Sequence, residues 1–120
     1  MEGKKYDLED RTLEFSKRIL KMVKALPAND INKHYTNQII RSSSSVGANY
    51  REANDALGKK DFEHRVKISR KESKETSFWI ELIMEHNPRM KSRMQDILNE
   101  NIELTKILSS IITKSKNKSF

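Results

Sequence analysis

Apolar residues recur every three or four positions along most of this chain, which is the spacing of one face of an α-helix. The first such stretch predicts a helix over about 8–26. Asp7 can cap its start, and Pro27 ends it. The second stretch predicts a helix over about 30–57, capped by Asn29 or Asp30 and closed by Gly58, with Lys59 and Lys60 in a short loop.

The second half of the chain repeats this pattern. Asp61 is a suitable N-cap for a third helix over about 62–86, and Pro88 fits the first turn of a fourth over about 88–113. The tail, 114–120, is basic and is predicted to be flexible. Four long helices joined by short loops predict an all-α fold in one domain, 1–120: an antiparallel up-down-up-down four-helix bundle.

Composition sharpens this picture. Apolar residues make up 35% of the chain and charged residues 34%, so the apolar stripes are narrow. The chain has no cysteine, which excludes disulfides, thiol catalysis and zinc–thiolate sites. The N-terminal residues contain no apolar signal segment, and no stretch has the length of a membrane span. We therefore expect a cytoplasmic protein.

The formal net charge is +7, which makes a polyanion a reasonable partner. The third predicted helix carries lysine and arginine at i, i+3, i+4 and i+7, a spacing that forms one basic face suited to a phosphate backbone. With the neighbouring basic residues, the candidate nucleic-acid-binding set is Lys59, Lys60, Arg65, Lys67, Arg70, Lys71 and Lys74. The alternative is a solvated face, partly balanced by Glu63, Glu72 and Glu75.

Two further groups of cations could extend such a surface, although for each group alone solubility is the favoured explanation. They lie on the first helix and in the tail: Lys17, Arg18, Lys21, Lys24, Lys114, Lys116 and Lys118. Phe78 and Trp79 could stack on bases, but helical spacing with Leu82 and Ile83 favours core or subunit-interface packing.

The stretch RSSSSVGANYRE, 41–52, is small and polar although it lies within a predicted helix. Arg41, Ser45, Asn49 and Glu52 share one helical face. The middle of the third helix is polar too, and sequential helices of a bundle pass each other at their middles. The two stretches predict a structural polar seam between the second and third helices: Arg41, Ser45, Asn49, Glu52, Glu72 and Glu75.

A catalytic interpretation of the seam would assign acid–base work to Glu52 and Glu75, which requires a cleft and a perturbed carboxylate. Metal binding has little support, because a di-iron bundle needs two Glu-x-x-His motifs and the chain has none. His64, in a lone Asp-x-x-His, is the nearest approach. No glycine-rich phosphate loop occurs either. We expect no metal, no cofactor and no enzymatic activity.

The polar stretch resembles the four-helix-bundle proteins of the 23S rRNA intervening-sequence family. The resemblance extends from about Leu8 to Ile111 and rests on Phe15, Pro27, Arg41, Ser45-Val46, Asn49-Tyr50, Glu52, Phe62 and Glu75. Family members often follow the glutamate with glycine, where this chain has Ala53, and isoleucine is common where it has Val46. The resemblance implies a homopentameric ring. It also implies kinship with the accessory protein of diversity-generating retroelements, a basic pentamer that works with a reverse transcriptase and nucleic acid.

These observations favour a non-enzymatic, basic, oligomeric protein that associates with nucleic acid, structured RNA in particular, through phosphate contacts. The alternative is a protein–protein adaptor, for example for a reverse transcriptase, with no direct role on nucleic acid. A hydrolase that uses Glu52 or Glu75 is the third interpretation.

Overall fold

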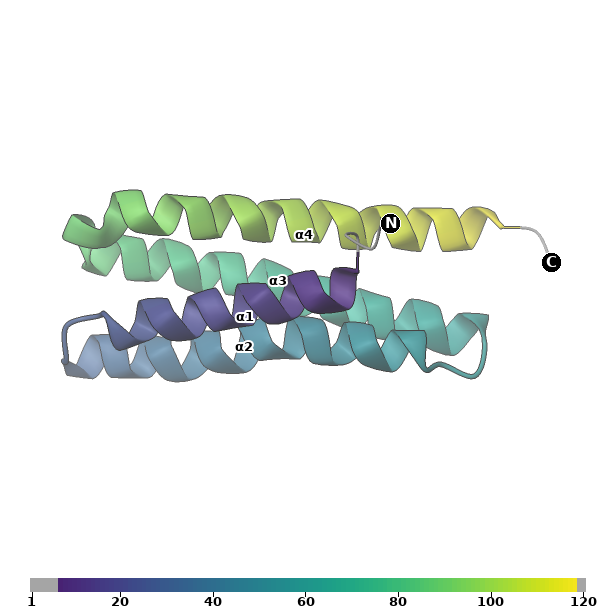
Figure 1. Ribbon diagram of the computed structural model, residues 1–120, viewed down its shortest axis with the longest axis horizontal. Helices are drawn as coiled ribbons and strands as arrows, with labels where there is room; N and C mark the ends of the chain where they lie inside the picture. The colour runs from purple at the N-terminus through teal and green to yellow at the C-terminus, as the bar shows by residue number, and fades with distance from the viewer. Residues whose placement is uncertain (1–6, 119–120) are drawn as a thin grey trace.

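A computed structural model describes residues 7–118 of the chain. This part is all-α, with no strand and with four long helices: α1 (Leu8–Lys24), α2 (Asp30–Asn54), α3 (Lys59–His86) and α4 (Lys91–Asn117). A single 3₁₀ turn, η2 (Pro88–Met90), precedes α4. The helices run antiparallel to their sequence neighbours, as in an up-down-up-down bundle (Figure 1). The prediction of an all-α fold with four helices is confirmed.

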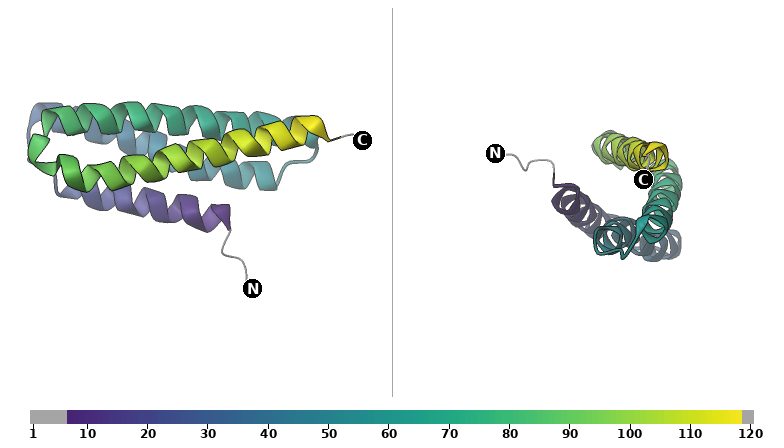
Figure 2. Two further views of the ribbon diagram at one scale, coloured as in Figure 1. Left: turned by 90° about the horizontal axis from the view of Figure 1, so that it is seen from above. Right: turned by 90° about the vertical axis from the view of Figure 1, so that its right-hand side faces the viewer.

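The helices form an open arc in the end-on view, with α1 and α4 at its two ends (Figure 2). Packing is closest between α2 and α3 and between α3 and α4, whereas α1 packs mainly on α2 and only lightly on α4. With 17 residues, α1 is much shorter than the others. It does not extend to the end of the molecule that holds the α2–α3 connection (Figure 1).

The helix ends correct several details of the sequence prediction. Asp7 caps α1 as predicted, accepting hydrogen bonds from two backbone amides, and Asn29 caps α2. However, α2 ends at Asn54 rather than near Leu57. Gly58 is the N-cap of α3, not the C-cap of α2, so Lys59 and Lys60 lie in the first helical turn and not in a loop. Asp61 is within that turn and does not cap it.

The other boundaries also differ from the predicted ones. α1 ends at Lys24, before the predicted limit of 26. Pro88 opens the 3₁₀ turn rather than α4 itself. α4 then continues to Asn117, so the part of the tail from 114 to 117 is helical rather than flexible. Residues 119 and 120 lie outside the described residues. Lys114 and Lys116 are exposed in the last turn of α4, where positive side chains interact favourably with the helix dipole.

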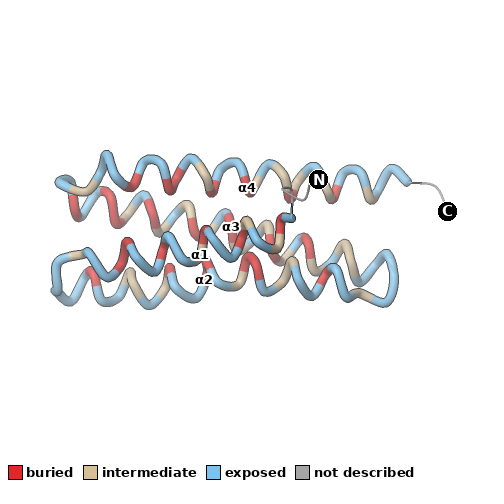
Figure 3. Tube along the Cα trace, in the orientation of Figure 1, coloured by how far each residue is buried: buried red, intermediate tan, exposed pale blue. Residues whose placement is uncertain are grey.

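The core follows the inner faces of the helices, and the outer faces are exposed (Figure 3). Ile39 and Val46 from α2, Val66 and Ile80 from α3, and Leu104 from α4 are all completely buried. The inward stripe of α3 changes character at its middle, where Ser69, Ser73 and Thr76 are also completely buried. Small hydroxyl side chains at these positions let α3 lie close to both α2 and α4.

Two contacts fix the positions of neighbouring helices. Gly47 of α2 faces α1, where an added Cβ would lie 2.8 Å from Thr12 Oγ1 and 3.2 Å from Thr12 Cβ. The glycine therefore allows α1 to approach α2 closely. The second contact joins the buried amides of Asn32 and Asn87, which exchange hydrogen bonds of 2.9 and 2.8 Å and tie the start of α2 to the end of α3.

Candidate nucleic-acid interface

A ridge of four exposed lysines follows the outer side of α3. Lys60, Lys67, Lys71 and Lys74 occupy i, i+7, i+11 and i+14, and all four are exposed. We call them the lysine ridge. None of the four makes a hydrogen bond or an ion pair with a residue that the structure describes. Their charges are therefore available to an external anion. The four lysines lie in a line along the helix axis, an arrangement that can contact successive phosphates of a nucleic-acid backbone.

The other three residues of the predicted basic set lie off this ridge. Arg65 is half-buried and faces the Asp61 carboxylate at 3.9 Å. Arg70 lies against α4, where its Nη1 donates to Ser109 Oγ at 3.5 Å. Lys59 Nζ donates to the carbonyl oxygen of Lys118 at 3.4 Å. The seven predicted residues thus do not form one face, because positions 65 and 70 point along the flanks that α3 shares with its neighbours.

Rings gather beside the end of the lysine ridge. Phe78 is four positions after Lys74 on the same face, and 56% of it is exposed. Its ring centroid lies 5.2 Å from that of Trp79, in an edge-to-face arrangement. Trp79 in turn contacts Tyr35 and His34 of α2, with centroids 5.9 and 6.2 Å away. Trp79 therefore packs at the α2–α3 interface as expected, but Phe78 is not a core residue.

The charged part of the predicted polar seam is built around Arg41. The Arg41 guanidinium donates to a carboxylate oxygen of Glu72 at 3.1 Å and to one of Glu75. Glu75 also accepts a 3.0 Å hydrogen bond from Trp79 Nε1. The pKa of Glu75 is lowered, first by this Trp79 hydrogen bond and then by Arg41, against the opposing effect of burial. The pKa of Arg41 is raised, chiefly by Glu75.

A lowered pKa keeps Glu75 ionised and paired at neutral pH, whereas a general acid or base needs a value near the working pH. The arrangement at Glu75 therefore supports an ion pair at the edge of the α2–α3 interface rather than acid–base chemistry.

The remaining predicted seam residues do not cross between helices. Ser45 Oγ donates to the Arg41 carbonyl, and Asn49 Nδ2 donates to the Ser45 carbonyl, both within α2. Glu52 is exposed, and its carboxylate has no hydrogen bond or ion pair with any described residue. The predicted face of α2 is displaced from the buried face by one residue around the helix. The inward positions of α2 include Ser42, Ser43, Val46 and Gly47.

Serine and threonine hydroxyl groups make buried hydrogen bonds where α3 packs on α2 and α4. Thr76 Oγ1 is 2.9 Å from Ser42 Oγ, and Ser69 Oγ donates to the Val46 carbonyl at 2.6 Å. On the other side of α3, Ser73 Oγ lies 2.8 Å from Thr105 Oγ1 of α4. The sequence pattern drew attention to the serines of the polar stretches but did not show which of them point inward. A 3–4 spacing of Ser69, Ser73 and Thr76, continued by Ile80, was the signal that could have found them.

Comparison with known proteins bears on the identity of the chain. The profile of the 23S rRNA-intervening sequence protein family matches residues 4–110. The chain belongs to this family. A crystal structure of a protein of unknown function from the S23 ribosomal protein family, from Bacteroides thetaiotaomicron, has 36% sequence identity to it and a TM-score of 0.76. The match covers 87% of this chain and 96% of that one. Among proteins with curated descriptions, none matches.

In this member of the 23S rRNA-intervening sequence family, the weak packing of α1 on α4 leaves a second basic surface. A groove of about 340 Å³ between the two helices is lined by Arg18 and Lys21 of α1 and by Arg93 and Asp96 of α4. The three cations have no ion pair with a described residue. The sequence pattern had placed Arg18 and Lys21 on a solvated face, and only the fold brings Arg93 beside them.

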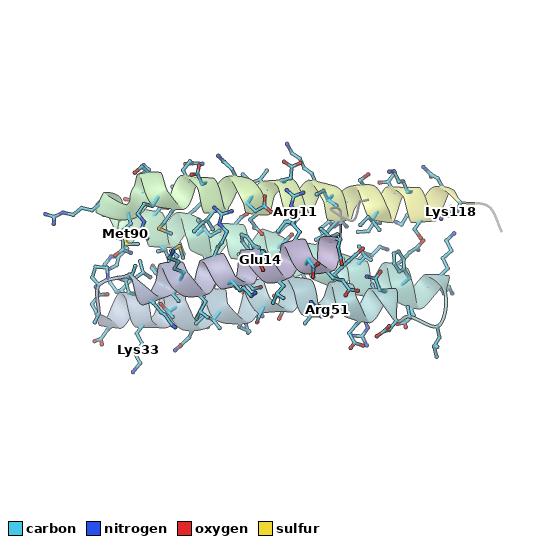
Figure 4. The ribbon with its side chains drawn as sticks, in the orientation of Figure 1. Arg11, Glu14, Lys33, Arg51, Met90 and Lys118 are labelled. Atoms are coloured by element: carbon cyan, nitrogen blue, oxygen red, sulfur yellow. The ribbon has the colours of Figure 1, made fainter. Side chains whose placement is uncertain are left out.

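A bidentate ion pair marks the other place where α1 meets α4. Arg11, labelled in Figure 4, donates from Nε and Nη2 to the two carboxylate oxygens of Glu100 at 2.8 and 2.9 Å. This geometry orients α1 across the arc.

Two apolar hollows remain on the surface of this family member. One, of about 260 Å³, lies between α1 and α2 and is lined by Leu13, Ile19, Leu20 and Ile40 with serines around them. Leu13, Leu20 and Ile40 are each at least 40% exposed. The other, which we call the end cleft, has a volume of about 490 Å³ and lies where α1 does not reach. Its lining includes Ala53, Phe62, Ile111, Lys59 and Lys114.

No helix within residues 7–118 is long and apolar enough to cross a membrane. In the same range, no group of three or more histidine, aspartate and glutamate side chains is placed so that it could hold a metal ion.

Proposed function

We propose that this chain is a non-enzymatic, homo-oligomeric protein of the cytoplasm that associates with nucleic acid, structured RNA in particular, through phosphate contacts. The lysine ridge carries the proposal. It places four cations in a line on one helix, and none of them forms a hydrogen bond or an ion pair with a described residue, although Lys71 interacts electrostatically with Glu75. A formal net charge of +7 adds a long-range attraction for a polyanion.

The experiment compares two triple variants with equal net charge. The first, Lys67→Gln/Lys71→Gln/Lys74→Gln, removes most of the lysine ridge. The control, Lys33→Gln/Lys91→Gln/Lys106→Gln, removes three exposed lysines from other helices. Affinity for a structured RNA is measured from low to physiological salt. Loss of three phosphate contacts makes the negative slope of log K against log salt shallower by about 2 to 3, and the control leaves the slope near the wild-type value.

Two outcomes would contradict the proposal. Absence of binding to RNA and to duplex DNA, even at low salt, would remove nucleic acid as a ligand. Equal losses in both triple variants would mean that net charge, rather than the ridge, attracts the RNA.

Self-association is the second part of the proposal, and the resemblance specifies a homopentameric ring akin to the retroelement accessory protein. The apolar hollow between α1 and α2 supports it, because Leu13, Leu20 and Ile40 form a contiguous exposed patch of the kind that subunit interfaces cover. Leu20→Glu should dissociate the assembly by burying a charge in that interface. Light scattering tests this expectation, and a wild-type monomer at micromolar concentration would refute the ring.

The alternative function is an adaptor that docks a protein such as a reverse transcriptase, without contacting nucleic acid. The end cleft favours it, since an apolar floor rimmed by lysines suits an acidic amphipathic helix. A pull-down before and after nuclease treatment separates the two functions. A partner retained after nuclease, and lost on Phe62→Asp, would support the adaptor.

A further inference from the structure

We infer that Phe78, supported by Trp79, is a stacking platform at the end of the lysine ridge, so that the ridge takes an unpaired strand, such as a loop of a structured RNA, rather than a duplex. This inference rests on the proposed function, because it names the form of nucleic acid that the same surface binds.

The exposure of Phe78 is the first observation. A phenylalanine that is 56% exposed on the outer face of a helix contributes little to the core, because much of its apolar area stays in water. The neighbouring residues Ile80 and Ile83 occupy the core positions of this part of α3 and are completely buried. The side chain is therefore free to cover something else.

The ring is also held in place from one side. Trp79 meets it edge to face at 5.2 Å between centroids, and Trp79 is fixed by its hydrogen bond to Glu75 and by the rings of Tyr35 and His34. A fixed neighbour limits the rotation of Phe78, which lowers the entropic cost of stacking on a base. The platform is thus part of the α2–α3 interface rather than a loose surface ring.

The positions along α3 match a backbone path that ends in a stacked base. Lys67, Lys71, Lys74 and Phe78 share one face over about 16 Å, at roughly 1.5 Å of rise for each residue. Beyond Phe78 the same side of the helix carries the exposed Glu81 and Glu85. These carboxylates repel phosphate, so the strand must leave the ridge at or before Phe78, where its base can turn onto the ring.

This combination of a cationic track and a ring distinguishes single strands from duplexes. An unpaired base offers its face to the ring, whereas bases within a duplex already stack on each other and present only phosphates and groove edges. Phenylalanine has no hydrogen-bonding group, so the platform accepts any base and provides no sequence specificity.

The test uses full-length protein with a single-stranded oligonucleotide and a duplex of the same length and sequence. Phe78→Ala is compared with Ile102→Ala, which trims an apolar side chain that is 41% exposed on α4. We expect Phe78→Ala to weaken single-strand binding about 5- to 100-fold, the effect of one lost base stack, without changing the salt slope. Phe78→Tyr should retain the affinity. Duplex binding should be weaker than single-strand binding and insensitive to Phe78→Ala.

Fluorescence provides an independent readout, because Trp79 is the sole tryptophan of the chain. Single-stranded RNA should change its emission in the wild type and in Ile102→Ala.

Each result has a distinct meaning. Binding to no nucleic acid would remove the proposed function itself. Binding in which Phe78→Ala behaves like Ile102→Ala, or in which the duplex is bound as tightly as the single strand, would overturn the platform and leave the proposed function standing. Light scattering on Phe78→Ala covers one more result: a smaller assembly would place Phe78 in a subunit interface and would also overturn the inference.

Discussion

The buried amide pair of Asn32 and Asn87 offers the sharpest test of how this fold is held together. Asn32 Nδ2 donates to Asn87 Oδ1 and to the Pro27 carbonyl, both at 2.9 Å. Asn87 Nδ2 donates back to Asn32 Oδ1 at 2.8 Å, and also to the Ile83 carbonyl. The exposures of the two residues are 2% and 7%, so water cannot replace these bonds without opening the structure.

Asn32→Ala removes three hydrogen bonds and leaves Asn87 Oδ1 buried without a donor. At about 0.5 to 1.5 kcal/mol for each bond, and with the penalty for an unsatisfied buried group, the expected loss in the free energy of unfolding is about 2 to 4 kcal/mol. Asn87→Ala should cost a similar amount. The double variant should cost less than the sum by about 1 to 3 kcal/mol, because both single variants remove the two shared bonds.

Denaturant unfolding followed by circular dichroism measures these values, at one protein concentration because the proposed self-association would also contribute to stability. Asn32→Asp is a nearly isosteric control. Its carboxylate faces two acceptors, so the variant should be most destabilised at neutral pH and should recover as the pH falls toward about 4. A loss below about 0.5 kcal/mol for Asn32→Ala, or additivity in the double variant, would refute this account.

Three further predictions follow from other contacts. Gly47→Ala should destabilise the fold by about 1 kcal/mol, since overpacking against Thr12 exceeds the gain in helix propensity, and Thr12→Ala should relieve the effect in the double variant. Because the pKa of Glu75 is lowered in the folded protein, its ionised form stabilises the fold. Above pH 4.5, the free energy of unfolding should therefore be larger for the wild type than for Glu75→Gln. This difference should disappear as the pH falls through the folded-state pKa of Glu75, which unfolding at several pH values measures. Glu81→Gln/Glu85→Gln should tighten RNA binding at low salt, and unchanged affinity would contradict the path assigned to the strand.

The hydrophobic pattern was enough to give the helices, since a 3.6-residue period is a local property of the chain. Caps with a local signal, such as Asp7 and Asn29, were also found. The assignment failed around Gly58, where a glycine suits either the end of α2 or the start of α3. The local sequence does not distinguish a C-cap of α2 from an N-cap of α3, because a glycine at either position lies outside the regular helix.

The candidate site was predicted only in part. Residues 67, 71 and 74 were assigned to one basic face by spacing alone, and they are exposed. The roles of Arg65 and Arg70 depend on where α2 and α4 lie against α3, which spacing does not contain. Phe78 was predicted to pack in the core or in a subunit interface, because an apolar residue at helical spacing is normally inward, and the structure excludes the core.

What the sequence determined by itself was the class of fold, the family and an excess of positive charge, because periodicity, family pattern and composition are all written along the chain. Only the tertiary structure decided which polar groups are buried. It turned Ser42, Ser69 and Thr76 inward and left Glu52 in water, although all four residues lie in equally polar stretches. The deciding factor is the rotation of each helix about its own axis. A helix in a bundle is fixed by the contacts of both neighbours, and a turn of one residue, about 100°, exchanges a buried face for an exposed one.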